Sequence, residues 1–202
     1  MTSVSVAMAT YNGGNYLSDQ LKSIAAQTRL PGELIVCDDV STDNTMEILS
    51  DFAQTVPFEV RLFRNERNVG YALNFERAIA SCRGEIILLS DQDDYWNVDK
   101  VHVIECAMEQ HTSAWMLIDD AKIGDENLET TGLTVVGQDK AAGISSDEHL
   151  LGCCIAFRSS MKPLIIPVPW RNFGHDGWTN SLARALGRRL YIQDTLQIYR
   201  RH

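Results

Sequence analysis

The sequence is poor in positive charge, which excludes one large class of partner. Of its 202 residues, 18 are Lys or Arg and 27 are Asp or Glu, so the formal net charge is −9. Nucleic-acid-binding proteins usually present a basic stripe, and we therefore expect no nucleic-acid partner. An anionic ligand would need local compensation from a metal ion, a helix N-terminus or a few arginines.

Paired cysteines and long apolar runs are also lacking. The five cysteines are odd in number and form no CxxC motif, and most stand in apolar stretches, as buried reduced thiols do. The apolar runs, such as 86–89 and 153–157, are too short to span a bilayer. The first residues have neither the basic nor the apolar region of a signal peptide. We therefore expect a cytoplasmic protein without a transmembrane segment.

The first half of the chain alternates between strand-like and helix-like segments. Short apolar runs predict strands at 4–8, 34–37, 60–63 and 85–89, and apolar residues at helical spacing follow the first three. This alternation predicts an α/β fold whose mostly parallel sheet carries helices on both faces. No Pro/Gly/Ser-rich linker divides the chain, so we expect a single domain.

The second half is less regular. Helices are predicted around 98–110 and 177–186, and strands at 114–118 and 150–157. Residues 126–148 are polar, contain three glycines and show little periodicity, which predicts a long, mobile loop region.

Three of the four early strands end in polar clusters. These are residues 9–12, the pair Asp38-Asp39, and residues 90–94. Ligands of open parallel sheets bind beyond the carboxyl ends of the strands, so the clusters should share one edge. One acidic cluster alone is readily explained by turn and helix-cap residues. Two at one edge repel each other unless a counter-ion is present.

The last cluster suggests what that counter-ion is. Asp91 and Asp93 form an Asp-x-Asp motif directly after an apolar strand. Two carboxylates at this spacing suit a hard cation such as Mg²⁺ or Mn²⁺, whose remaining positions take phosphate oxygens and water. The sequence therefore predicts a metal–diphosphate site, which also explains how an acidic protein binds an anion.

Taken together, these motifs resemble the series found in glycosyltransferase family 2. The matching segments lie in the family's order at 9–13, 38–43, 65–70, 90–96, 175–178 and 199–202. Within the family, the chain is most similar to the bacterial rhamnosyltransferase-like branch that builds surface polysaccharides. The resemblance implies a GT-A fold with a Rossmann-like sheet, a nucleotide-diphosphate-sugar donor, Mn²⁺ or Mg²⁺ as cofactor, and inversion at the anomeric carbon. The donor would be a dTDP- or UDP-sugar, with dTDP-rhamnose as one candidate.

The resemblance also assigns donor-side residues. Thr10 and Tyr11 would line the base pocket. Asp39 would contact the base, and Asp38 would lie near the base or the ribose. The remaining donor-side assignments are Asn68 and Gly70 at the start of a helix, Asp91 at the ribose or a metal-bound water, and Asp93 as a direct metal ligand.

On the acceptor side, Asp176 occupies the position of the family's catalytic base. The alternative is that it caps a helix beginning at Gly177. His202 matches a metal ligand that follows a Tyr-Arg pair. Because the family usually continues beyond this point, we expect a chain truncated at its C-terminus, with a naturally short family member as the alternative. His175 is expected to be a structural or acceptor-side group.

The resemblance implies one GT-A domain over 1–202, with a nucleotide-sugar-binding half at 1–97 and an acceptor-side half at 98–202. The acceptor would be a glycan or a lipid-linked molecule of bacterial surface polysaccharide synthesis. Association with the inner face of the plasma membrane and the oligomeric state are left open. The alternative function is a catalytically idle nucleotide-sugar-binding module. A dinucleotide oxidoreductase would need G-x-G-x-x-G after the first strand, where only Gly13-Gly14 stands.

Overall fold

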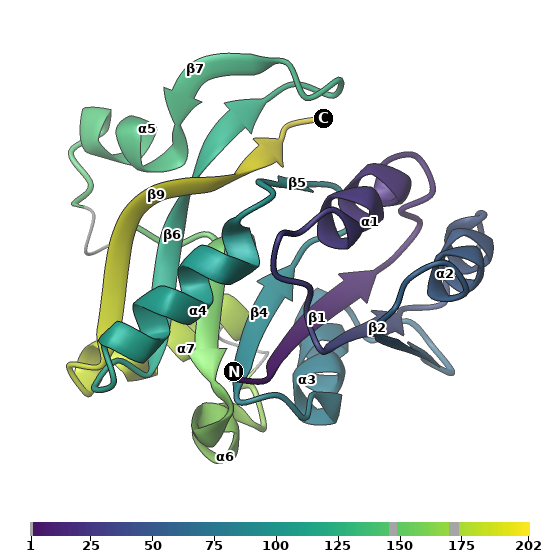
Figure 1. Cartoon of the computed structure of the whole chain (residues 1–202), viewed down its shortest axis with the longest axis horizontal. Helices are drawn as coiled ribbons and strands as arrows, with labels where there is room; N and C mark the ends of the chain where they lie inside the picture. The colour runs from purple at the N-terminus through teal and green to yellow at the C-terminus, as the bar shows by residue number, and fades with distance from the viewer. Residues whose placement is uncertain (1, 146–148, 170–173) are drawn as a thin grey trace.

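The computed structural model describes residues 2–145, 149–169 and 174–202. Within them, one nine-stranded sheet has the strand order β3-β2-β1-β4-β8-β6-β9-β5, with β7 beside β6 (Figure 1). The strands are β1 (Val4–Thr10), β2 (Glu33–Asp38), β3 (Glu59–Arg64), β4 (Ile86–Ser90), β5 (Tyr95–Trp96), β6 (Met116–Gly124), β7 (Thr130–Thr134), β8 (Ile155–Arg158) and β9 (Arg189–Arg200). The α-helices are α1 (Leu17–Ala25), α2 (Thr45–Ala53), α3 (Tyr71–Ser81), α4 (Lys100–Gln110), α5 (Val135–Ala141), α6 (Lys162–Ile165) and α7 (His175–Ala185). Two short 3₁₀ turns are η1 (Gly152–Cys154) and η2 (Ser159–Met161).

The first four strands form the parallel part of the sheet. β1 lies between β2 and β4, and β2 pairs with β3, all in parallel. Every residue of β2 and β4 is buried, as expected for strands covered on both faces, which explains their unbroken apolar sequences. The four predicted strands and the α/β fold are confirmed.

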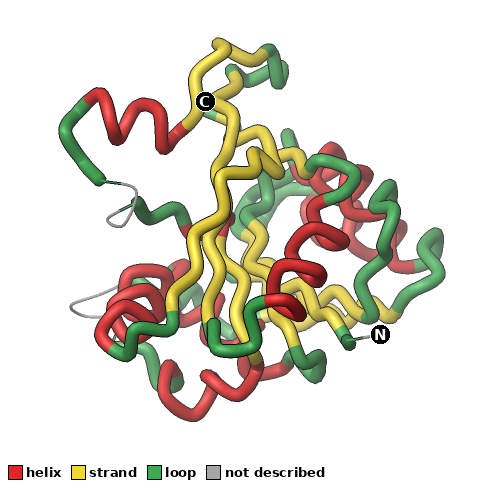
Figure 2. Tube along the Cα trace, turned by 60° about the vertical axis from the view of Figure 1, so that its left-hand side comes forward, coloured by secondary structure: helices red, strands yellow, loops and turns green. Residues whose placement is uncertain are grey.

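Helices cover both faces of this sheet (Figure 2). Apolar side chains of α1, α2 and α4 pack on the face to which Val6 and Leu34 point. Those of α3, α6 and α7 pack on the other face with Ala7 and Ile35. Neighbouring residues of β1 thus belong to opposite layers, because successive strand side chains point to opposite faces.

The second half extends the same sheet with mixed strand directions. β8 is antiparallel to both β4 and β6, whereas β9 is parallel to β6. β9 is twelve residues long and pairs with β6 from Arg189 to Arg200, with register shifts on the way. Its end meets the two-residue strand β5 and brings the C-terminal end of the chain beside β5 (Figure 1). This strand was not predicted from the sequence.

The prediction of a loop over 126–148 is wrong for most of that range. It contains β7 and the helix α5, while 146–148 lie outside the described residues. Thr134 begins α5 by accepting a hydrogen bond from Gly137 N (3.0 Å), and Asp120 Oδ1 accepts another from Val136 N (3.0 Å). Val136 is the only buried residue of α5, so the helix leaves no apolar periodicity in the sequence. The predicted strand at 150–157 begins only at Ile155, after η1.

The cysteines agree with the expected reduced state. All five are free, and all are buried except Cys106, which is half-buried. Among the described residues, no helix is long and apolar enough to cross a membrane.

Candidate functional site

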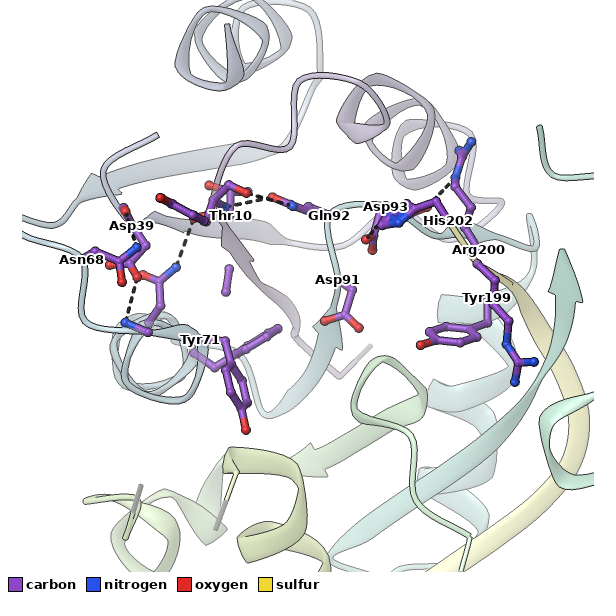
Figure 3. A pocket seen from close by; sticks show the side chains of 16 residues that line it. Thr10, Asp39, Asn68, Tyr71, Asp91, Gln92, Asp93, Tyr199, Arg200 and His202 are labelled. Carbon is purple, nitrogen blue, oxygen red and sulfur yellow. Dashed lines mark hydrogen bonds and ion pairs between the residues drawn. The ribbon is translucent and has the colours of Figure 1, made fainter. Parts of the chain in front are cut away.

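A cavity of about 800 Å³ opens where β1, β2 and β4 end (Figure 3). Its walls come from the strand ends, the start of α3, the turn after β4 and the last residues of the chain. The lining residues are Ala9, Thr10, Tyr11, Asp39, Asn68, Gly70, Tyr71, Asn74, Phe75, Asp91, Gln92, Asp93, Tyr199, Arg200, Arg201 and His202. The three polar clusters therefore do share one edge of the sheet.

Asp39 organises one end of this cavity. Its carboxylate is 2% exposed and accepts hydrogen bonds from Asn65 Nδ2 (2.7 Å), Val69 N (2.9 Å) and Gly70 N (2.9 Å). Gly70 has φ 84° and ψ 160°, a conformation open essentially to glycine alone, and α3 begins at the next residue. Asp39 thereby fixes the turn that places Asn68 and Gly70 on the cavity wall.

Asp38 is not on the cavity wall. It is fully buried and accepts hydrogen bonds from Thr10 Oγ1 (3.1 Å) and Ser41 N (3.0 Å), and Arg64 Nε lies 3.5 Å from its carboxylate. Its hydrogen bond with Thr10 holds the end of β1 in place, and Thr10 itself lines the cavity. A contact of Asp38 with a base or ribose stays a prediction.

Tyr11 is held by Gln92, whose role was not predicted from the sequence. Tyr11 N donates to Gln92 Oε1 (2.9 Å), and Gln92 Nε2 donates back to Tyr11 O (3.2 Å). A Cβ on Gly13 would lie 2.4 Å from that same Gln92 oxygen, so a side chain there would disturb the pair. Gln92 thus links the turn after β4 to the loop after β1, while the Tyr11 side chain remains half exposed.

The other end of the cavity is acidic. Burial raises the pKa of Asp91 well above its usual value, and the charges of Asp94, Asp93 and Asp176 add to the effect. Burial also raises the pKa of Asp93, against an opposing influence of His202, and raises that of Asp94 to about 6. A nearby cation would stabilise these buried, mutually repelling carboxylates, because a positive charge favours their ionised form.

His202 meets Asp93 although 109 positions separate them in the chain. His202 Nε2 lies 3.1 Å from Asp93 Oδ2, and the imidazole stacks on Tyr16 with ring centroids 4.5 Å apart. The structure thus brings the two predicted metal ligands together (Figure 3). A carboxylate oxygen and an imidazole nitrogen at this spacing could hold a divalent cation.

Arg200 helps to hold His202 beside Asp93, a role that was not predicted from the sequence. Its Nε donates to Asp93 O (2.7 Å), and its Nη2 donates to Asp19 Oδ2 (3.0 Å). The guanidinium also lies over the Tyr16 ring, 4.6 Å from the centroid. The arginine of the terminal motif was visible in the sequence, but its partners depend on the register of β9.

Asp176 lies in the first turn of α7, outside the cavity wall. The helix begins at His175 after Gly174, so the predicted start at Gly177 was two residues late and Asp176 is not the N-cap residue. Its Oδ1 accepts a hydrogen bond from Gly177 N (2.8 Å). A Cβ on Gly152 would lie 3.5 Å from Asp176 Oδ2, an ordinary contact distance, so η1 packs directly beside this carboxylate.

His175 is buried between this carboxylate and the cavity wall. The residue is 4% exposed, its ring stacks on Phe75 at 4.0 Å, and neither ring nitrogen has a hydrogen-bond partner among the described residues. Burial lowers its pKa to about 4, with Asp176 opposing the shift, so the imidazole is neutral at physiological pH.

Comparison with known proteins identifies the family. The model of glycosyl transferase family 2 matches residues 5–159. The dTDP-rhamnosyl transferase RfbG of Shigella flexneri is 38% identical over 104 residues, which cover 49% of this chain and 36% of RfbG.

Two solved structures share the fold. TarS 1-349 of S. aureus, in complex with UDP, superposes with a TM-score of 0.81 at 21% identity and covers 98% of this chain. The mannosyltransferase PcManGT of Pyrobaculum calidifontis, with GDP-Man and Mn²⁺, gives a TM-score of 0.76 at 18% identity over 98% of this chain. The chain spans 60% of the TarS 1-349 chain and 56% of the PcManGT chain. The likeness shows the GT-A fold, and the family match over most of the sequence shows that this chain belongs to glycosyltransferase family 2.

Proposed function

We propose that this protein transfers a sugar from a nucleoside-diphosphate sugar to a glycan or lipid-linked acceptor in polysaccharide synthesis. The observation that carries the proposal is the polarity of the cavity (Figure 3). Tyr11, Asp39 and Asn68 line one end, and Asp91, Asp93 and His202 line the other. A nucleotide has the matching polarity, with a flat hydrogen-bonding base at one end and an anionic diphosphate at the other.

The acidic end fits a divalent cation. Asp93 Oδ2 and His202 Nε2 would hold it, and Asp91, which lines the same cavity and interacts electrostatically with Asp93, would bind the ribose or a metal-bound water. When bound, the cation would neutralise the diphosphate and stabilise it as a leaving group. The nitrogen donor favours Mn²⁺ over Mg²⁺, which prefers oxygen ligands, and Mn²⁺ is the ion in the PcManGT complex.

At the other end, Thr10, Tyr11 and Asp39 would bind the base, with Asn68 and Gly70 beside the donor. We propose a dTDP- or UDP-sugar. The name of RfbG specifies a dTDP-rhamnosyl donor, and TarS has been solved with UDP and with UDP-GlcNAc. Residues 1–97 would supply most of the donor site and 98–202 the acceptor side.

Asp176 would act as the general base. A carboxylate on the acceptor side takes the hydroxyl proton as the new sugar bond forms, and attack opposite the leaving diphosphate inverts the anomeric carbon. The charge of Asp176 also acts on Asp91, which places the proposed base within electrostatic reach of the diphosphate end.

The test is a comparison of wild type with Asp176→Asn, using dTDP-rhamnose, UDP-glucose and UDP-GlcNAc with glycoside acceptors and Mn²⁺. We expect release of nucleoside diphosphate by the wild type and a loss of about 10²–10⁴-fold in the variant. Affinity for the nucleoside diphosphate should stay within about twofold, because the base acts on the other substrate.

Asp99→Asn is the matched control. Asp99 also stands at the start of a helix, α4, but it is exposed and bonded to Thr28 Oγ1 (2.8 Å), so this variant should keep the wild-type rate. An Asp176→Asn protein as active as wild type would remove Asp176 from the mechanism. A wild type that binds nucleotide and Mn²⁺ but turns over no donor would favour the idle binding module.

A further inference from the structure

Three buried polar side chains form a chain behind the acidic end of the cavity. Asp94, Lys100 and Gln197 are each at most 2% exposed. Lys100 Nζ donates to Gln197 Oε1 (2.7 Å), and Gln197 Nε2 donates to Asp94 Oδ2 (3.2 Å). We call these three residues the polar latch.

The direction of these hydrogen bonds is fixed by the chemistry of the groups. A lysine ammonium has three donors and no acceptor, so only the amide oxygen of Gln197 can face it. The amide NH₂ of Gln197 must then face Asp94, whose carboxylate accepts it. The other two Lys100 donors point to Asp119 Oδ2 (3.0 Å) and Cys153 O (3.3 Å), which anchors the latch in the core.

The latch joins two segments that carry the proposed metal ligands. Asp94 follows Asp93 in the turn after β4, and Gln197 lies on β9, five residues before His202. The other oxygen of Asp94, Oδ1, accepts a hydrogen bond from Arg200 N (3.2 Å). The adjoining backbones are also paired, since Trp96 of β5 lies opposite Gln197 of β9 (Figure 1). The side chain of Asp94 therefore binds β9 at two points, at Gln197 within the β5–β9 pairing and at Arg200 beyond it.

We propose that Asp94 and Gln197 are positioning residues that lock the end of β9 onto the turn after β4 and so hold His202 beside Asp93. This inference rests on the proposed metal site and adds residues that would not touch the metal. Groups that orient metal ligands in this way commonly change metal affinity about 10–100-fold when they are altered.

The competing role for Asp94 is that of a metal ligand. One ligand atom each of Asp91, Asp94 and Cys153 lies within 4.8 Å of the other two, a spacing that a cation could bridge. Asp94, however, already accepts a hydrogen bond at each oxygen, from Gln197 and from Arg200. The two roles differ in what they require of residue 94: a ligand needs its negative charge, whereas a latch needs only complementary hydrogen bonds.

A swap of the two functional groups separates these roles. Asp94→Asn has one oxygen for two donors, so its NH₂ must face either the Gln197 NH₂ or Arg200 N, and Gln197→Glu places a carboxylate against Asp94. Each single variant therefore breaks the latch. The double variant Asp94→Asn/Gln197→Glu restores one donor and one acceptor at that contact. It keeps the acceptor for Lys100, an acceptor for Arg200 N and the total charge.

The readout is Mn²⁺ affinity, measured from the electron paramagnetic resonance signal of free Mn²⁺ without nucleotide. We expect each single variant to bind about 10–100-fold more weakly than wild type and the double variant to return to within about threefold. Amide exchange at Arg200, followed by NMR, should rise in Asp94→Asn and fall again in the double variant, whether or not Mn²⁺ is present.

Glu33→Gln is the matched control. Glu33 is another buried carboxylate, bonded to Ser5 and Arg83 N near the opposite end of β1, so this variant should lower stability without changing Mn²⁺ affinity. A double variant as weak as Asp94→Asn would overturn the latch and make Asp94 a ligand. Single variants with wild-type affinity and exchange would overturn it as well. A wild type that binds no Mn²⁺ would contradict the proposed metal site itself, and the Arg200 exchange would then decide whether the latch holds β9.

Discussion

The carboxylates of the site differ in their hydrogen-bond partners. Asp39 accepts three hydrogen bonds from the turn before α3, and Asp38 is bonded to Thr10 and Ser41. Asp93, by contrast, shares its carboxylate with His202, at the cavity wall. The carboxylates of Asp38 and Asp39 accept several hydrogen bonds from the chain and so fix the shape of the site. The carboxylate of Asp93 contacts an imidazole that could itself bind a metal, so both groups could bind a cation. Neighbouring acidic residues in one motif series therefore need not share a role.

The buried imidazole of His175 predicts a specific sensitivity to acid. Burial lowers its pKa from 6.5 to about 4, so the unfolded chain takes up a proton between these values and the folded protein does not. The contribution of His175 to stability should therefore be complete above about pH 6.5 and be lost on acidification toward pH 4, by about 3 kcal/mol, while the raised pKa values of Asp91 and Asp94 act in the opposite direction. Urea unfolding across this window measures the loss.

Two variants isolate the contribution of His175. His175→Phe keeps an aromatic ring on Phe75 and should lose less stability than wild type between about pH 6.5 and pH 4. His111→Gln removes an exposed imidazole and should keep the wild-type pH dependence. Identical pH profiles for wild type and His175→Phe would show that another group causes the acid loss.

At the level of elements, the start of α3 depends on one glycine. Gly70 holds φ 84° and ψ 160°, and no atom of the described residues lies within 4 Å of a Cβ built there, so the strain in Gly70→Ala comes from the backbone. We expect a loss of about 1–3 kcal/mol in the free energy of unfolding, measured by chemical denaturation.

Gly177→Ala is the control, for which we expect the opposite change in the free energy of unfolding. Gly177 is helical within α7, and its nearest neighbour would be Leu150 Cδ2 at 3.9 Å, so alanine should stabilise by about 0.5–1 kcal/mol. A Gly70→Ala protein as stable as wild type would mean that the turn before α3 adopts another conformation in solution.

The elements that could be predicted from the sequence are those whose burial leaves a regular apolar pattern within the element itself. β1, β2 and β4 are mostly apolar because both faces are covered, β3 keeps a short apolar run, and α1 and α3 carry apolar stripes, so all were visible. β9 is mostly half-buried and alternates irregularly, and α5 buries only Val136. Both depend on partners distant in the chain, which local periodicity cannot reveal.

The same division applies to the site. The motifs named Asp91, Asp93 and His202, and the strand-end rule placed the first two at the correct edge. The contacts of Gln92 with Tyr11 and of Arg200 with Asp93 span 81 and 107 positions. Their geometry follows from the strand order and the register of β9, so the sequence contains the residues but not the pairing.

At the scale of the whole molecule, the site brings together residues from the beginning and the end of the chain. The sheet runs without a break from β3 to β5, and the last residues return to the turn after β4. The cavity therefore combines Thr10 and Tyr11 from the beginning of the chain with Tyr199 to His202 from its end. In the proposed function, cation and nucleotide would bridge these two ends, so each should strengthen binding of the other.

This coupling is the most direct test of the account. Calorimetric titrations of UDP and dTDP would compare Mn²⁺ with EDTA in wild type, in Asp93→Ala and in Asp51→Ala, which removes an exposed carboxylate of α2 as a charge-matched control. We predict at least about tenfold tighter binding with Mn²⁺ in wild type and Asp51→Ala, and loss of that gain in Asp93→Ala. Equal affinity in Mn²⁺ and in EDTA for the wild type would contradict the proposed metal–diphosphate site.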